Sequence, residues 1–406
     1  MNFIDLFSGA GGLSEGFIKA GFNPVAHVEM DAHACNTLET RLVYHKLKDE
    51  NKLDYYYDYL LGNLSRETFI SQFGDKKLTD SVLNISIGGK NNNTIFKKID
   101  ELAKSNEIDL IVGGPPCQAY SLVGRARDKK GMKNDPRNFL YKEYAKFLKN
   151  YRPKAFVFEN VLGLISAEKG LYFKNMQKYF RSIGYNLDYK IQHSEDFGVL
   201  QKRRRVILIG WRKDIEFNYP IFDKYEHNFK VQDLLVDLKK LKPGEQKNIT
   251  KYKTYTTEYL KQFELRNGVD FVSQHIARPH NDRDLKIYEI AIKKWQRNER
   301  LKYPDLPDKL KTHKNEKSFL DRFKVVDANG LSHTMVAHIA KDGHHYIYPD
   351  TRQVRSLSVR EAARIQSFPD DFFFEGGRSA SFRQIGNAVP PLMAFEIATK
   401  ISEKIK

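Results

Sequence analysis

Short apolar runs alternate with helical stretches over the first half of the chain. The apolar runs are Asn2–Phe7, Pro24–Asp31, Ile108–Val112, Ala155–Phe158 and Val206–Gly210. Helical patterns lie between them, as in Tyr141–Tyr151 and Leu171–Gly184. Buried strands that alternate with helices are typical of βαβ units. The pattern therefore predicts an α/β fold with a doubly wound, mostly parallel sheet.

Two segments depart from this alternation. Residues from about 48 to 107 are rich in Lys, Asn and Tyr and hold weak helical pieces, so we expect an insertion there. A second, basic and aromatic segment lacks strand–helix alternation, which favours a second, smaller domain. Regular patterns resume at Leu357–Gln366 and Phe382–Ile401. The predicted divisions are a first domain over 1–215, a second over 216–326, and a return to the first over 327–406.

Composition narrows the class of protein. The 406 residues are 41% hydrophobic, enough for a sizeable core, and include only two cysteines, which argues against a disulfide scaffold. No signal-peptide pattern opens the chain, and no apolar run approaches the roughly 20 residues needed to span a bilayer. We expect a soluble, cytoplasmic protein without membrane association. The net charge of +17 and pI near 9.4 point to a polyanionic partner, with nucleic acid favoured over an anionic membrane surface.

The first strand runs into a glycine-rich turn, DLFSGAGGLSEGF (Asp5–Phe17). Such a turn lets the backbone approach a ligand closely and directs helix N-terminal amides at it. The glycines at 9, 11 and 12 do not form a GxGxxG motif, so a plain tight turn is the alternative. Glu29 ends the second strand, where a carboxylate can bind ribose hydroxyls, while Asp31 suits a helix N-cap.

Two reactive side chains follow later strands. Cys117 lies in GGPPCQAYS (Gly113–Ser121), directly after a buried run, and Glu159 follows AFVF. In an open α/β sheet, ligands sit beyond the carboxyl ends of the strands, so a thiol nucleophile and a carboxylic acid should face one crevice. Cys35, on a predicted helix, is expected to be a buried structural thiol. No metal site is predicted.

The basic stretch QKRRRV (Gln201–Val206) precedes another strand. Since side chains on a strand alternate between its faces, Arg203 and Arg205 should share one face and Arg204 the other. Two guanidiniums aimed together would suit carbonyl or phosphate oxygens. A solvated basic surface is the alternative.

With these pieces in order, the chain resembles the DNA (cytosine-5) methyltransferases of bacterial restriction–modification type. The motifs that carry the resemblance appear in the family's order: DLFSGAGG, GGPPCQAYS, ENV, QKRRR, REAARIQSFPDDF and QIGNAVPP. The resemblance covers nearly the whole chain apart from the insertion and the second domain. It implies a Rossmann-like, S-adenosylmethionine-dependent catalytic domain and a smaller target-recognition domain.

The resemblance also implies residue roles. Cys117 matches the nucleophile, Glu159 the acid that contacts the cytosine ring, Arg205 the group that holds its carbonyl oxygen, and Arg203 accompanies them. The matching cofactor-binding positions are Phe7, Ser8, Gly9, Gly11, Gly12, Glu29, Met30, Pro115, Leu140, Asn387 and Ala388. The family usually has an acid after a third strand to contact the adenine amino group. The stretch SVLNISIGGKNNN has no convincing equivalent, so that contact stays unassigned.

The implied partner is double-stranded DNA, bound by a monomer, with a cognate restriction endonuclease as a functional partner. We expect residues 121–138 to form a mobile loop that closes over DNA. A tRNA cytosine-5 methyltransferase of the same family is the nearest alternative, since that branch uses the same machinery. A catalytically silent DNA-binding regulator would not need the reactive residues. A nucleotide-dependent oxidoreductase would leave GGPPC and QKRRR unexplained.

Overall fold

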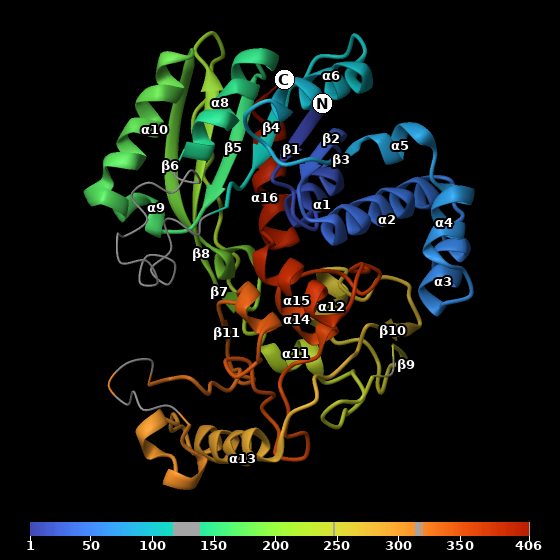
Figure 1. Cartoon of the computed structure of the whole chain (residues 1–406), viewed down its shortest axis with the longest axis vertical. Helices are drawn as coiled ribbons and strands as arrows, with labels where there is room; N and C mark the ends of the chain where they lie inside the picture. The colour runs from blue at the N-terminus through green and yellow to red at the C-terminus, as the bar shows by residue number, and fades with distance from the viewer. Residues whose placement is uncertain (117–138, 247, 313–316, 318–319, 406) are drawn as a thin grey trace.

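A seven-stranded sheet forms the centre of the molecule (Figure 1). The computed structural model describes residues 1–116, 139–246, 248–312, 317 and 320–405. The strand order is β3-β2-β1-β4-β5-β8-β6. The strands are β1 (Asn2–Leu6), β2 (Asn23–Glu29), β3 (Val82–Asn84), β4 (Leu110–Gly113), β5 (Ala155–Asn160), β6 (Tyr185–His193) and β8 (Arg204–Arg212).

The sheet is mostly parallel, as the sequence predicts. β1 pairs in parallel with β2 and β4, β2 with β3, and β4 with β5. β8 is the exception, because it runs antiparallel to both β5 and β6. Its amino end therefore lies at the edge where the parallel strands end. This direction matters for the site, since basic residues precede β8 in the sequence.

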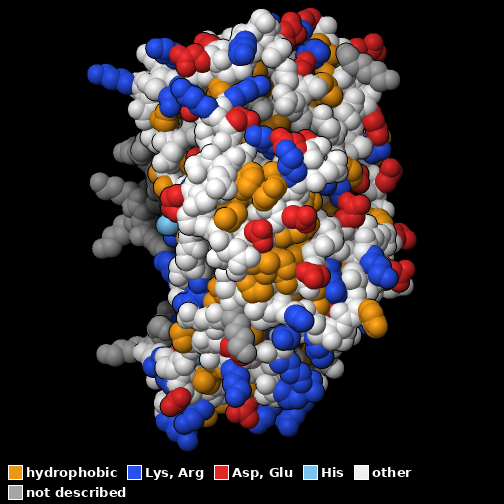
Figure 2. Space-filling view, turned by 90° about the vertical axis from the view of Figure 1, so that its right-hand side faces the viewer, with side chains coloured by type: hydrophobic (Ala, Val, Ile, Leu, Met, Phe, Trp, Pro, Cys, Tyr) orange, Lys and Arg blue, Asp and Glu red, His pale blue; other side chains and the backbone are white. Residues whose placement is uncertain are grey.

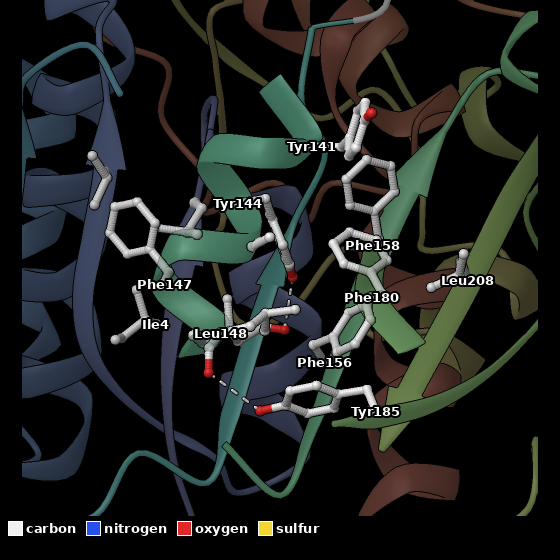
Figure 3. Close-up of a cluster of buried hydrophobic side chains, with 14 of the residues drawn as sticks. Ile4, Tyr141, Tyr144, Phe147, Leu148, Phe156, Phe158, Phe180, Tyr185 and Leu208 are labelled. Atoms are coloured by element: carbon white, nitrogen blue, oxygen red, sulfur yellow. Dashed lines mark hydrogen bonds between the residues drawn. The ribbon is translucent and has the colours of Figure 1, made fainter. Parts of the chain in front are cut away.

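Helices cover both faces of the sheet. Helices α6 (Asn91–Ala103), α8 (Leu140–Tyr151) and α10 (Leu171–Ser182) contribute to one hydrophobic cluster, which Figure 3 shows in part. Within it the Tyr144 hydroxyl donates to the carbonyls of Ile111 and Val157, at 3.0 Å each. A buried tyrosine thus ties a helix to two neighbouring strands while its ring fills the core.

On the other face, helices α1 (Gly12–Lys19) and α16 (Pro391–Ser402) pack together in a second cluster. Gly16 allows the close approach, because a Cβ there would lie 2.4 Å from the Phe395 nitrogen. The C-terminal helix therefore belongs to the same body as the first strand. α9 (Gly163–Ser166) and short 3-10 turns at Ala167–Gly170 and Ser194–Phe197 complete this part of the chain.

The first part of the range expected as an insertion, 48–107, forms a helical group at the edge of the sheet. This group follows the long helix α2 (Ala32–Asp49) and comprises α3 (Leu53–Leu61), α4 (Arg66–Phe73) and α5 (Lys76–Asp80). The rest of the range holds β3 and α6, which belong to the sheet and to the helices that cover it. Tyr59 stacks on Phe69 with ring centroids 4.5 Å apart, and Tyr56 is fully buried. Phe271, far along the chain, joins the same cluster. The helical group is thus folded against the later segment.

The later part of the chain has short elements around two further clusters. They are α11 (Val231–Leu235), α12 (Glu258–Gln262), α13 (Asp282–Gln296), α14 (Val359–Ile365), α15 (Arg378–Asn387) and the strands β7 (Gln201–Lys202), β9 (Ile249–Lys251), β10 (Phe271–Ser273) and β11 (Ser332–His333). Further 3-10 turns lie at Tyr303–Asp305, Asp308–Leu310 and Ala337–Ala340. Both clusters include residues from each side of position 326.

The surface is uneven in charge. Figure 2 shows Lys and Arg side chains gathered at the lower end of the molecule, and a hydrophobic patch with acidic neighbours at mid-height. Among the described residues, no helix is both long and apolar enough to cross a bilayer.

Candidate active site

A cavity of about 1430 Å³ opens at the carboxyl edge of the sheet. Residues that follow β1, β2, β3, β4 and β5 all line it. Its wall continues to residues of α13 and of the segment from Val336 to Tyr346, in the lower half of Figure 1. This is the place that the topology of an open α/β sheet favours for a ligand.

The glycine-rich turn supplies one end of the cavity. Phe7, Ser8, Gly9 and Gly12 line it, and Phe7 and Gly9 have positive φ of 59° and 55°. A Cβ on Gly9 would meet no atom within 4 Å, whereas one on Gly12 would lie 2.3 Å from the Val389 carbonyl oxygen. Gly11 does not line the cavity and is the left-handed N-cap of α1. The three glycines therefore have different roles: Gly9 leaves the cavity wall open, Gly12 allows close packing, and Gly11 caps α1.

Glu29 lies beside this turn and binds backbone amides. Its Oε2 accepts from the Gly9 amide at 2.8 Å, and its Oε1 accepts from the amides of Met30 and Asp31 at 2.8 Å each. These bonds hold the carboxylate at the cavity wall. Asp31 caps α2, since its Oδ1 accepts from the amides of His33 and Ala34. The sequence-based distinction between the two acids is consistent with this geometry.

Asp5 is a cavity residue that the sequence reasoning missed. It is 1% exposed, and Ser14 donates to its Oδ2 at 2.5 Å, while Oδ1 has no hydrogen-bond partner among the described residues. Burial raises the pKa of Asp5 to about 7, and the nearby Glu29 charge acts in the same direction. The sequence signal was an acid inside the otherwise apolar run Asn2–Phe7.

Glu159 and Arg205 form the charged centre of the cavity. Arg205 Nε lies 2.7 Å from Glu159 Oε1, and both side chains are nearly buried, at 11% and 13% exposed. Gly114 leaves room for the carboxylate, because a Cβ there would lie 2.7 Å from Glu159 Oε2. The pair exists because β8 runs antiparallel to β5, which brings Arg205 to the end of that strand. A guanidinium and a carboxylate can together bind a polar ring.

Cys117 lies outside the described residues, but the chain leading to it is described. Pro115 and Pro116, the residues before it, line the cavity. Asn160 is 2% exposed, and its Nδ2 donates to the Pro115 carbonyl at 3.2 Å. Asn160 thus ties the proline segment to the end of β5, next to Glu159. The expected mobile loop, residues 121–138, also lies outside the described part of the chain.

Arg203 does not share the position of Arg205. It is 1% exposed, is absent from the cavity wall, and donates to the backbone carbonyls of Met335 and Ala388 at 2.6 and 2.8 Å. The prediction of two guanidiniums aimed together is therefore wrong. β8 begins only at Arg204, so strand alternation does not extend back to Arg203.

The remaining predicted positions do lie at the cavity. Met30, Leu140, Asn387 and Ala388 line it, and Met30 is 69% exposed. Sequence reasoning missed Ile85, Ser86 and Ile87, which line the cavity directly after β3, where no acid could be assigned. Cys35 is buried, and burial raises the pKa of its thiol to about 12, which suits an inert structural residue.

Comparison with known proteins identifies the family. The family model of the C-5 cytosine-specific DNA methylases matches residues 1–62 and 84–403. The chain belongs to the C-5 cytosine-specific DNA methylases. The residues left out, 63–83, contain α4 and α5, within the range expected for an insertion.

Relatives and solved structures agree with this C-5 methylase membership. The chain is 42% identical to Type II methyltransferase M.Bpa9945I of Bacillus paralicheniformis, over 100% of this chain and 99% of that protein. It is 30% identical to Type II methyltransferase M1.HphI of Haemophilus parahaemolyticus, over 99% and 86%. Its fold is similar to that of a prophage-encoded E. coli protein described as a DNA modification methyltransferase, with a TM-score of 0.66, 23% identity and coverage of 100% and 99%. The fold is thus that of a Rossmann-like methyltransferase.

Proposed function

We propose that this methylase transfers a methyl group from S-adenosylmethionine to C5 of a cytosine flipped out of a specific duplex DNA sequence, through a transient covalent bond to Cys117. The observation that carries the proposal is that the Glu159–Arg205 pair, Glu29 and Pro116, the residue before Cys117, line one cavity in a chain of this family. We further propose that it protects host DNA beside a cognate endonuclease, in the cytoplasm. The names of its Type II methyltransferase relatives support the protective role.

The cavity fits S-adenosylmethionine at its glycine-rich end. The buried Asp5 Oδ1 lacks a hydrogen-bond partner among the described residues, so it can accept a bond from a cationic ligand. Glu29 can accept from ribose hydroxyls, and the open space beside Gly9 leaves room for a ligand at the backbone. We propose that Phe7, Met30, Leu140, Pro115, Asn387 and Ala388, with Ser8 and Gly12, form the rest of this pocket.

The chemistry needs the charged pair beside the thiol. The cofactor, when bound, supplies an electrophilic methyl group on a positively charged sulfur. C5 of cytosine is a poor nucleophile, and addition of the Cys117 thiolate at C6 makes it enamine-like. Glu159 would donate a proton to N3 and Arg205 would donate hydrogen bonds to O2, so that both stabilise the negative charge that the thiolate brings to the ring. After methyl transfer, loss of the C5 proton to a base expels the thiolate and restores the ring.

The target base has to leave the duplex, because neither Glu159 nor Arg205 could reach a stacked ring. Flipping a base costs a few kcal/mol. Contacts with phosphates can offset that cost, and the net charge of +17 suits them. Residues of α13 and of the segment from Val336 to Tyr346 line the same cavity and would face the DNA.

The test traps the proposed covalent bond. Bisulfite sequencing of randomised duplex DNA treated with the protein first gives the methylated site. An oligonucleotide with 5-fluorocytosine at that position is then incubated with protein and S-adenosylmethionine. Fluorine cannot leave as a proton does, so the thioether at C6 should persist and appear as a protein–DNA adduct in a denaturing gel.

The two cysteines of the chain provide a matched control. Cys117→Ala should form no adduct and transfer no methyl group, whereas Cys35→Ala should behave as wild type, since Cys35 is buried and does not itself line the cavity. Absence of an adduct with wild-type protein would overturn the proposed mechanism. Methylation of tRNA but not of duplex DNA in a parallel assay would overturn the proposed substrate.

A further inference from the structure

Arg203 joins two segments that are 53 positions apart in the chain, Met335 and Ala388. Its Nη1 donates to the Met335 carbonyl at 2.6 Å, and its Nη2 donates to the Ala388 carbonyl at 2.8 Å and, more weakly, to that of Gly386 at 3.5 Å. The side chain is 1% exposed. One buried, planar guanidinium thus holds both segments through its rigid fork.

The two segments, which both line the cavity, have different neighbours. The Val336 amide donates to the Tyr346 hydroxyl, in the segment that contacts α13 where His344 meets Tyr288. Ala388 lies against the glycine-rich turn, because a Cβ on Gly12 would lie 3.1 Å from Ala388 Cβ. The segments also touch, because a Cβ on Gly386 would lie 2.3 Å from the Ala337 nitrogen. Figure 1 shows β7, which ends one residue before Arg203 in the sequence, and β11 between the sheet above and α13 below.

Two glutamines extend the same network. Gln201 Nε2 donates to Gln366 Oε1 at 2.5 Å, and Gln201 Oε1 accepts from the Met335 amide at 2.7 Å. Gln366 Nε2 donates to the Ala388 carbonyl at 2.7 Å. Met335 is therefore held at both its amide and its carbonyl, and the Ala388 carbonyl has two donors. Buried polar networks of this kind restrict movement when their members are satisfied.

We infer that Arg203 is a positioning residue that couples the two sides of the cavity. A ligand against Asn387 and Ala388 would fix the Ala388 carbonyl, and the shared guanidinium would then hold Met335 and the Val336–His338 wall in place. The inference rests on the proposed function, with the methyl donor on one side and DNA on the other. Each ligand should bind more tightly when the other is present, and by the same factor.

The experiment measures that factor in a binding cycle. S-Adenosylhomocysteine, the product, replaces the methyl donor so that no turnover occurs. DNA dissociation constants are measured with and without it, and its own constants with and without target duplex. The coupling factor is the ratio of a ligand's dissociation constants without and with the other ligand, and for wild-type protein we expect at least about five. Arg203→Lys keeps the charge but loses the planar, forked guanidinium. For this variant we expect a coupling factor within about twofold of one.

Controls separate coupling from general damage. Arg204→Ala, an exposed neighbour in the chain, should keep the wild-type factor. In Arg203→Lys the binary affinities should change far less than the coupling, whereas a merely structural role would weaken both binary affinities together. If Arg203→Lys does not fold, Gln366→Met removes the other donor to Ala388 and should lower the coupling in the same direction.

The outcomes distinguish this inference from the proposed function. Full coupling in folded Arg203→Lys, or a wild-type protein that binds both ligands independently, would overturn the inference alone. A wild-type protein that binds neither ligand would overturn the proposed function, and the inference with it.

Discussion

At the residue scale, the position of Glu159 predicts a specific loss. Its carboxylate is paired with Arg205 at 2.7 Å and lines the cavity. Glu159→Gln keeps the shape but replaces the ionisable carboxyl group with a neutral amide. We expect the single-turnover rate of methyl transfer to fall by about 100- to 1000-fold, as for loss of one charge-stabilising group, with DNA affinity largely kept.

A surface carboxylate gives the matched control for this substitution. Glu264 is also paired with a cation, Lys19, at 2.8 Å, but its side chain is 66% exposed. Glu264→Gln should leave the rate of methyl transfer unchanged. A Glu159→Gln rate within threefold of wild type would remove Glu159 from the proposed chemistry.

Asp5 makes folding stability depend on pH. Its pKa is about 7 in the folded protein and near the usual 3.8 in the unfolded chain. As pH rises from about 4 to about 7, the unfolded chain loses the proton while the folded protein keeps it, so stability falls. Relative to Asp5→Asn, wild type should lose on the order of 4 kcal/mol of unfolding free energy over that range. Urea unfolding of both proteins at pH 4.5 and 7.5 tests this, and parallel curves would contradict it.

Single residues also show which parts of the site could not be predicted from the sequence. Glu159 could be placed because polar side chains at the carboxyl ends of buried strands meet at one sheet edge. Arg205 precedes its strand, so its role was expected only from the family resemblance, and the antiparallel direction of β8 is what brings it to that edge. Asp5 was missed because its apolar run was interpreted only as a strand. The error at Arg203 has another cause: its partners, Met335 and Ala388, are more than 130 positions away, and local alternation contains no information about them.

At the element scale, the direction of one strand decides the site. Six strands of the central sheet run in one direction, and β8 alone runs in the other. The sequence predicted β8 as a strand but not its direction. β6 was not predicted at all, because it is an edge strand with many exposed polar positions, unlike the apolar inner strands. The predicted run Phe382–Ile401 is two helices, since Pro390 interrupts it.

The contact between α1 and α16 leads to a prediction about packing. A Cβ on Gly16 would lie 2.4 Å from the Phe395 nitrogen and 2.5 Å from Ala394 Cβ. Gly16→Ala would therefore push the C-terminal helix away from the first helix. We expect a loss of about 1–3 kcal/mol in unfolding free energy, measured by urea denaturation.

The control for this prediction is a glycine in open space. Gly377 has φ of −74°, and a Cβ there would meet no atom within 4 Å. It is the N-cap of α15, where Ser is favoured, so Gly377→Ser should leave stability unchanged or raise it slightly. Equal stability of Gly16→Ala and wild type would show that the two helices can separate without cost.

At the scale of the whole molecule, ordered motifs were more informative than domain boundaries. The motifs from DLFSGAGG to QIGNAVPP predicted the family that the family model then matched over most of the chain. The division at residue 326 stays a prediction. Hydrophobic clusters contain residues from both sides of it, as Leu260 and Met335 do in one cluster. Such long-range packing cannot be inferred from local composition.

The basic charge of the whole molecule should act mainly through the cavity face. The proposed binding of DNA predicts that log K falls steeply with log salt, by about 0.9 per phosphate contact. Arg283 lines the cavity on α13, where it pairs with Asp284 at 3.3 Å, and its side chain is 45% exposed. Lys400, which pairs with Asp223 and Glu403, lies on α16 and does not line the cavity. Arg283→Ala should lower the salt slope by about one, and Lys400→Ala should not change it. Each cation that contacts a DNA phosphate releases counterions and so adds to the salt slope. Equal salt slopes for the Arg283→Ala and Lys400→Ala variants would therefore mean that DNA does not contact this wall of the cavity.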